Sequence, residues 1–189
     1  MKKKELIFVT GNKYKHVEIA KILENNVKLV QVKEHLEEPD LAKIEDIAVY
    51  KARQAYKKLK KPVIVEDTGV YFSEYNDFPG HLAKRIYEGI GLNGLITLVK
   101  AAKNKKGYFK SVICYKASKE EVLFSGVLRG RFLTKLRKPK ANRLPYEKMF
   151  VPDNYKKAVV ELSLEEKNKI SHRAKAARKL KKWLEKNKF

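Results

Sequence analysis

Three segments that are far apart in the sequence carry residues whose types could do chemistry. The first is the run Thr10-Gly11-Asn12-Lys13-Tyr14-Lys15, which joins an expected strand to an expected helix. A glycine here would let the backbone turn sharply, and the free N–H groups at the start of the helix would then form an anion site. Lys13 and Lys15 add positive charge beside it. The alternative is an ordinary loop in which Asn12 caps the helix.

The second segment is Glu66-Asp67-Thr68-Gly69, which follows the apolar run Pro-Val-Ile-Val. Acids at the carboxyl end of a buried strand commonly face the ligand crevice of an open α/β sheet. Their oxygens suit Mg²⁺, which takes one or two carboxylates together with substrate phosphates. The acidic stretch with Glu37, Glu38 and Asp40 could supply a second carboxylate. The alternative is a solvated turn in which Asp67 caps the chain.

The third segment is Ser171-His172-Arg173, with Lys167 one turn earlier. On a helical wheel, Arg173 falls in the middle of an apolar face, so we expect it to reach inward at a helix start. It could contact a ligand there, or it could form a buried pair with a carboxylate. Lys51 gives a related signal, because it is centred on the apolar stripe of its own helix. It needs a partner or a wet cleft, unless its chain snorkels to the surface.

The elements that must position these residues follow from hydrophobic periodicity. Alternation and short apolar runs predict strands at Glu5–Thr10, Val27–Val32, Pro62–Val65, Gly107–Ala117 and Glu121–Phe132. Helical spacing predicts helices at Lys13–Glu24, Lys43–Leu59, Leu82–Glu88, Leu92–Ala102 and from Ser171 onward, with a capping box at Ser163–Glu166. This order predicts an α/β fold with a mixed sheet.

Composition narrows the class of protein. The 189 residues fit one domain, and 43% hydrophobic content rules out a fully disordered chain. No apolar run approaches the roughly 20 residues of a membrane-spanning helix. The lone Cys114 permits neither an internal disulfide nor a multi-cysteine zinc site, so we expect a reducing, cytoplasmic location.

A net charge of +22 implies affinity for polyanions, although a lysine-rich, glutamine-poor composition is also typical of growth at high temperature. The charge leaves two functions open. Basic groups from three segments, one carboxylate cluster and two helix starts together match a nucleoside triphosphate with a metal. The alternative is a non-enzymatic RNA- or DNA-binding module. In that case Tyr108, Phe109 and Tyr115 would form a stacking strip among the lysines Lys103, Lys105, Lys106 and Lys110.

Four motifs occur in an order that resembles the inosine triphosphate pyrophosphatase family, also called the non-canonical purine nucleoside triphosphate pyrophosphatases. They are Thr10-Gly11-Asn12-x-x-Lys15, Glu66-Asp67-Thr68-Gly69, Phe78-Pro79-Gly80 with Lys84, and Glu166-Lys167-x-x-x-Ser171-His172-Arg173. The resemblance runs from about Glu5 to the last helix. It implies Mg²⁺-dependent hydrolysis of ITP, dITP and XTP to the monophosphate and pyrophosphate. It also implies a homodimer of one domain, residues 1–189, whose elongated mixed sheet and flanking helices form two lobes around a central nucleotide cleft.

The resemblance also implies roles for single residues. Residues from Thr10 to Lys15 would grip phosphates, and Asp67 would hold the metal and act as the base for water. Glu38 is the nearest match to the second metal acid, and Asp46 matches another acidic position. Thr68, Lys51 and Lys84 would contact substrate, and the base would meet Lys167, His172 and Arg173.

One stretch departs from the family pattern. The family usually has a Phe-Gly-Tyr/Trp-Asp-Pro run that stacks on the base, whereas this chain has Leu144-Pro145-Tyr146-Glu147-Lys148. Tyr146 keeps a stacking ring and Glu147 keeps a carboxylate, but the glycine and the aspartate are absent. We therefore expect looser selectivity for the base.

Overall fold

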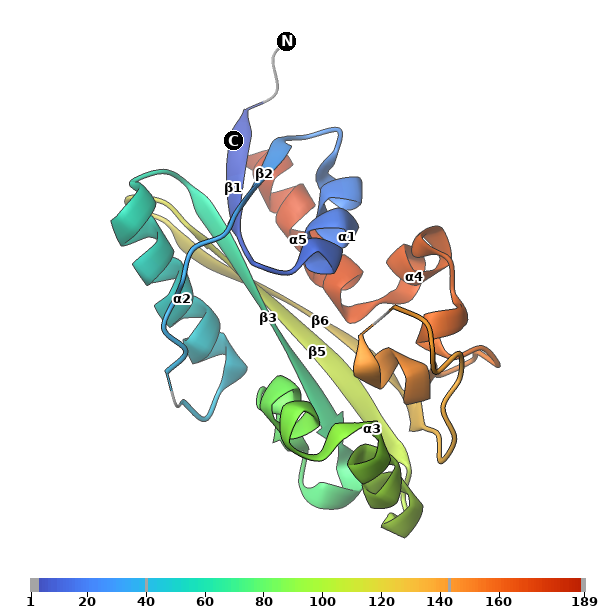
Figure 1. Cartoon of the computed structure of the whole chain (residues 1–189). Coiled ribbons are helices and arrows are strands. Elements are labelled where there is room, and N and C mark those ends of the chain that lie inside the picture. The colour runs from blue at the N-terminus through green and yellow to red at the C-terminus, as the bar shows by residue number, and fades with distance from the viewer. Residues whose placement is uncertain (1–3, 40, 143, 188–189) are drawn as a thin grey trace. The chain divides into compact units, whose positions relative to one another are not determined.

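The computed structural model describes residues 4–39, 41–142 and 144–187. It has a mixed α/β fold, as the sequence predicts, with helices flanking a seven-stranded sheet (Figure 1). The strands are β1 (Glu5–Val9), β2 (Lys28–Val32), β3 (Val63–Phe72), β4 (Phe78–Gly80), β5 (Lys106–Lys116), β6 (Glu121–Phe132) and β7 (Phe150–Pro152). The helices are α1 (Lys13–Leu23), α2 (Ile44–Leu59), α3 (Ala83–Ala101), α4 (Leu164–Ile170) and α5 (His172–Lys186). Short 3₁₀ turns lie at Ser73–Tyr75, Pro145–Met149 and Val159–Glu161.

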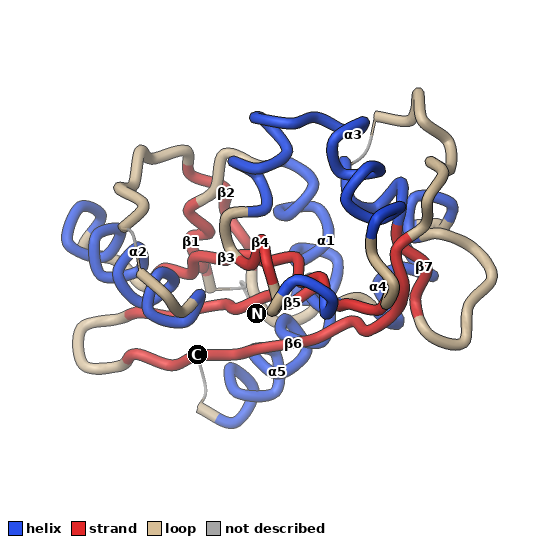
Figure 2. Tube along the Cα trace, turned by 90° about the horizontal axis from the view of Figure 1, so that it is seen from below, coloured by secondary structure: helices blue, strands red, loops and turns tan. Residues whose placement is uncertain are grey.

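The strand order is β2-β1-β3-β5-β6-β7, and β4 pairs with β3 outside this path (Figure 2). β1 runs parallel to both β2 and β3, whereas the β3–β4 and β6–β7 pairs are antiparallel. Parallel neighbours need a crossover connection, and α1 provides it between β1 and β2. The prediction of a mixed sheet is therefore confirmed.

The chain divides into two compact units, and the first consists of Met1–Thr68, Ser111–Gly126 and Ser171–Phe189. Alternate residues of its strands face opposite layers of helices, as the twofold period of a strand requires. Phe8 and Ile64 pack in one cluster with apolar residues of α1 and α5, whereas Val63 and Val65 pack in another with α2. Figure 1 shows α2 on one side of β1 and β3 and the α1–α5 pair on the other.

The second unit consists of Gly69–Lys110 and Val127–Ile170. Its core joins Phe72, Phe109 and Phe132 of the strands to Leu95 and Val99 of α3. The sequence predicts two helices here, and α3 does change direction between them, because Gly91 has a non-helical backbone with φ of 63°. Within the described ranges, none of the helices is both long enough and apolar enough to span a bilayer.

The main correction to the predicted elements concerns β3. The sequence predicts a short strand, Pro62–Val65, that ends at Glu66-Asp67-Thr68-Gly69, but β3 continues to Phe72. These polar residues therefore lie inside a strand that passes from the first unit into the second. Their side chains alternate between its two faces instead of forming one cluster.

Candidate active site

The turn after β1 is built around Asn12, which is the N-cap of α1. Its side-chain oxygen accepts from the backbone N–H groups of Tyr14 (2.9 Å) and Lys15 (3.3 Å), and Thr10 Oγ1 accepts from the N–H of Asn12 (3.1 Å). The capping interpretation is therefore correct. Gly11 does not have a left-handed backbone, and a Cβ added there would meet no atom within 4 Å, so the turn itself does not require glycine. Gly11 and Lys13 are both exposed at this helix start.

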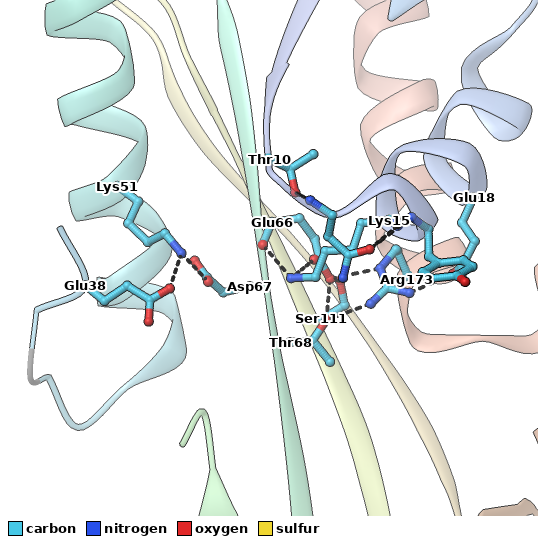
Figure 3. Close-up of polar contacts among 12 residues, drawn as sticks. Thr10, Lys15, Glu18, Glu38, Lys51, Glu66, Asp67, Thr68, Ser111 and Arg173 are labelled. Atoms are coloured by element: carbon cyan, nitrogen blue, oxygen red, sulfur yellow. Dashed lines mark hydrogen bonds and ion pairs between the residues drawn. The ribbon is translucent and has the colours of Figure 1, made fainter. Parts of the chain in front are cut away.

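Glu66 is the centre of a buried polar network on the α1–α5 side of β3 (Figure 3). Lys15 Nζ lies 2.6 Å from Glu66 Oε2, and Arg173 Nε lies 3.2 Å from Oε1. The hydroxyls of Ser111 (2.6 Å) and Thr68 (2.5 Å) donate to the same Oε1. Burial by itself would raise the pKa of Glu66, but the positive charges of Arg173 and Lys15 hold it well below its usual range. The carboxylate is therefore ionised and forms ion pairs with both Lys15 and Arg173.

Arg173 reaches inward at the start of α5, as the helical wheel predicts, and its side chain is fully buried. Of the two roles left open by the sequence, the structure shows the buried pair with carboxylates. Its Nη1 donates to Glu18 Oε2 (2.6 Å), and its Nη2 donates to Thr68 Oγ1 (3.0 Å). The sequence analysis missed Glu18, which is 2% exposed. Its position three residues after Lys15 is a usable signal, because residues three apart lie on the same face of a helix.

A second polar cluster lies on the α2 side of β3. Lys51 Nζ lies 2.7 Å from Asp67 Oδ1 and 3.1 Å from Glu38 Oε1. The expectation that a lysine on the apolar stripe of α2 needs a charged partner is therefore confirmed. Burial lowers the pKa of Lys51, but the charges of Asp67 and Glu38 outweigh it and raise the pKa above its usual value. Glu37, the neighbour of Glu38 in the sequence, makes another contact: its carboxylate accepts a hydrogen bond from the hydroxyl of Tyr50 (3.2 Å). Asp40, the other acid of this stretch, lies outside the described residues.

The two clusters flank β3 because its side chains alternate. Val63 and Val65 pack toward α2, so Asp67 continues that face, whereas Ile64 and Glu66 point to the α1–α5 side. Figure 3 shows Asp67, Lys51 and Glu38 on one side of the strand and Glu66, Lys15 and Arg173 on the other. This separation differs from the sequence-based expectation, in which Glu66 and Asp67 form one carboxylate cluster at the end of a strand.

The α2-side cluster has a donor set that fits Mg²⁺. Asp67 Oδ2 is buried and has no hydrogen-bond partner among the residues that the structure describes. No group of three or more His, Cys, Asp or Glu side chains within residues 4–39, 41–142 and 144–187 could hold a metal by itself. Mg²⁺ needs no such cage, because it usually takes one or two carboxylates, substrate phosphates and waters. Asp67 and Glu38 are the residues that would hold it.

The remaining candidates, apart from His172, lie in the second unit. Lys84 is 85% exposed and lies 3.7 Å from Glu88 on its own helix. Lys167 and Glu147, by contrast, form a buried ion pair of 2.5 Å. His172, the first residue of α5 in the first unit, is buried as well.

Tyr146 differs most from its expected place. Its ring is buried with Phe72 in the core of the second unit, and its hydroxyl donates to the carbonyl of Ala83 (2.8 Å). The interpretation of Tyr146 as an open stacking ring is therefore corrected, because the ring packs inside the protein.

The stacking strip proposed for nucleic acid does not form. Phe109 and Tyr115 are each 2% exposed, because alternate residues of β5 face the core. Tyr108 does reach the other face, but its ring stacks on Tyr71 at a centroid distance of 4.5 Å. The three aromatic rings therefore do not form one exposed stacking surface.

Comparisons with known proteins support the family resemblance that the order of the four motifs indicates. The model of the Ham1 family matches residues 6–183. A dITP/XTP pyrophosphatase from Hyperthermus butylicus is 36% identical over 97% of this chain and 96% of its own length. The inosine triphosphate pyrophosphatase of Saccharomyces cerevisiae is 34% identical over the full length of both chains. The solved Ham1 protein of Staphylococcus aureus shares the fold, with a TM-score of 0.83, 23% identity and coverage of 97% of this chain and 100% of that one. The chain therefore belongs to the Ham1 family.

Proposed function

We propose that this chain is a Mg²⁺-dependent pyrophosphatase that hydrolyses ITP, dITP and XTP to the monophosphate and pyrophosphate. The names of its relatives support this substrate class. The observation that carries the proposal is the position of Asp67. Its carboxylate is held by Lys51 at 2.7 Å beside Glu38, and its second oxygen has no hydrogen-bond partner among the described residues. A carboxylate so placed has an oxygen left for the proton of a water molecule.

In the proposed reaction, water attacks the α-phosphorus while Asp67 takes its proton. The bond between the α-phosphorus and the bridging oxygen breaks, and its electron pair leaves with pyrophosphate. Lys51, Lys15 and Lys13 would neutralise the charge that develops on the phosphate oxygens, which is the main contribution that a protein makes to phosphoryl chemistry. Mg²⁺, when bound, supplies further neutralisation at the same oxygens.

The strand lengths explain how one triphosphate could meet lysines on both sides of β3. β1 ends at Val9, and its register with β3 pairs Ile7 with Val63 and Phe8 with Ile64. Residues 66–68 of β3 therefore project beyond the last residue of β1. A phosphate chain lying across this projecting edge could meet Lys15 on one face and Lys51 on the other.

Base selectivity would come from hydrogen-bond donors. A 6-oxopurine presents an acceptor where adenine presents an amino group, and His172, Arg173 and Lys167 are rich in donors. The carboxylates of Glu18 and Glu66 hold the guanidinium of Arg173 in one orientation. Because these contacts bury Arg173 fully, His172 beside it would supply the donor to the base. That donor would be satisfied by a 6-oxopurine and would face another donor in ATP, at a cost of about 1–3 kcal/mol.

The test is product identification with ITP and Mg²⁺ in ¹⁸O-labelled water. We expect pyrophosphate rather than phosphate, with the label in the monophosphate, because water attacks the α-phosphorus. A label in pyrophosphate would place the attack on the β-phosphorus, and release of phosphate would indicate a different hydrolase. The values of kcat/KM should be higher for ITP and XTP than for ATP. We further propose that the chain forms a homodimer, which light scattering on the same sample tests.

A further inference from the structure

We infer that Lys51 competes with free Mg²⁺ for Asp67 and Glu38, so that the metal enters this site together with the nucleotide. The inference rests on the proposed function of the site as a triphosphate site. It starts from the position of one ammonium group, which lies between two carboxylates from separate segments of the chain, 2.7 Å from Asp67 and 3.1 Å from Glu38.

The competition follows from distances. Mg²⁺ binds carboxylate oxygens at about 2.0–2.1 Å, so a cation held by both Asp67 and Glu38 would lie close to the Lys51 ammonium, which now lies between these two carboxylates. The two cations would also repel each other at such short range. Mg²⁺ can therefore bind both carboxylates only if Lys51 withdraws.

Lys51 has a reason to stay until another anion arrives. Its side chain is only 13% exposed, so the ammonium would exchange an ion pair for incomplete hydration if it left alone. Its backbone is fixed, because Ala48, Ala52 and Ala55 of α2 are fully buried. The flexible four-carbon stem can still turn toward a phosphate. A triphosphate would supply both the new partner for Lys51 and the remaining ligands for the metal.

The two acids differ in how firmly they are placed. The side chain of Glu38 is 76% exposed, whereas that of Asp67 is 15% exposed on a central strand. Loss of Lys51 would therefore destabilise the ionised form of Asp67 more than that of Glu38, because a mostly buried carboxylate next to a second acid would lack a counter-charge. A neutral residue at position 51 should make this pair a stronger site for any divalent cation.

The experiment measures the binding of Mn²⁺, as a spectroscopic probe for Mg²⁺, by the wild type and by Lys51→Met without nucleotide. Counting free Mn²⁺ by electron paramagnetic resonance gives the affinity without any turnover. Methionine keeps the length and the apolar stem while removing the charge. We expect Lys51→Met to bind Mn²⁺ about tenfold more tightly than the wild type, or better, given the strength of a close like-charge contact.

The matched control is Lys58→Met on the same helix. Lys58 is 47% exposed and pairs with Glu34 at 3.6 Å, away from Asp67, so its loss should leave Mn²⁺ affinity unchanged. A non-hydrolysable ITP analogue should tighten Mn²⁺ binding in the wild type by a larger factor than in Lys51→Met, because the coupling between the ligands passes through Lys51.

Equal or weaker binding of Mn²⁺ by Lys51→Met would overturn the inference, since Lys51 would then support the metal site or play no part in it. Circular dichroism verifies the fold, and Lys51→Gln takes the place of the methionine variant if that variant unfolds. The result is separable from the proposed function. A wild type that releases no pyrophosphate from ITP would refute the function, while the Mn²⁺ comparison would still decide how Lys51 and the metal interact.

Discussion

Asp67 and Glu66 are adjacent, yet their carboxylates are engaged very differently. Glu66 is fully buried, accepts hydrogen bonds from three side chains and forms an ion pair with Lys15. Asp67, by contrast, contacts Lys51 and keeps Oδ2 without a hydrogen-bond partner among the described residues. We expect Asp67→Asn to retain the fold and to lose at least the 10²–10⁴-fold typical of removing a general base. The rate of pyrophosphate release from ITP, measured at saturating Mg²⁺, tests this expectation.

The control for Asp67→Asn is Asp153→Asn, which removes an exposed carboxylate in the second unit. It should keep wild-type turnover. Near-normal turnover by a folded, metal-saturated Asp67→Asn protein would show that another group accepts the proton of the water.

Glu66 should matter for stability as well as for binding. Glu66→Gln leaves Arg173 and Lys15 with one fewer counter-charge in a fully buried network. Breaking a buried ion pair on one side typically costs about 3–5 kcal/mol. We expect a loss of this order in the free energy of unfolding from urea titration. The exposed Glu120→Gln variant should change it little. If Glu66→Gln were as stable as the wild type, the network would not be a structural support of the first unit.

At the scale of elements, α3 offers two glycines in contrasting backbones. Gly91 has φ of 63°, where a side chain is strained, whereas Gly89 lies in regular helix and an added Cβ would meet no atom within 4 Å. Gly91→Ala should therefore destabilise the protein by about 1 kcal/mol or more. Gly89→Ala should stabilise it by about 0.5–1 kcal/mol, because alanine loses less backbone entropy in a helix. Urea titrations of both variants measure the contrast, and effects of the same sign would mean that Gly91 does not interrupt the helix in solution.

Helices were predictable from the sequence where one face is periodic. The stripe of α2 and the face of α5 gave the correct helices, and they also gave the inward positions of Lys51 and Arg173. The capping box is confirmed as well, because Ser163 and Glu166 bond reciprocally at the start of α4. These features depend on residues that are close in the sequence, so local reasoning finds them.

The length of β3 could not be predicted in the same way. Acids, threonine and glycine after Val65 are typical of turns, and their side chains would be costly inside a sheet without partners. The partners are distant in sequence, namely Lys15, Lys51 and Arg173. Local patterns contain no information on these pairings. The alternation that separates Asp67 from Glu66 therefore became visible only in the structure.

At the scale of the whole molecule, the net charge of +22 has two opposite consequences. Like charges repel within the folded chain, and they also attract a polyanionic substrate. Salt screens both effects, since the Debye length falls from about 30 Å at 0.01 M to about 10 Å at 0.1 M. A higher ionic strength should therefore raise the stability of the folded chain and lower the rate at which it captures substrate.

We expect the melting temperature to rise between about 20 and about 200 mM KCl, while kcat/KM for ITP at fixed excess Mg²⁺ falls, as screening requires. The control variant carries Lys179→Glu and Lys182→Glu, two exposed positions of α5, and its net charge is +18 instead of +22. Both salt effects should be smaller in this variant, although none of its changes touches the candidate site. A melting temperature that falls with salt would indicate that favourable ion pairs outweigh the repulsion. A kcat/KM independent of salt would assign the charge to something other than substrate attraction, such as adaptation to high temperature.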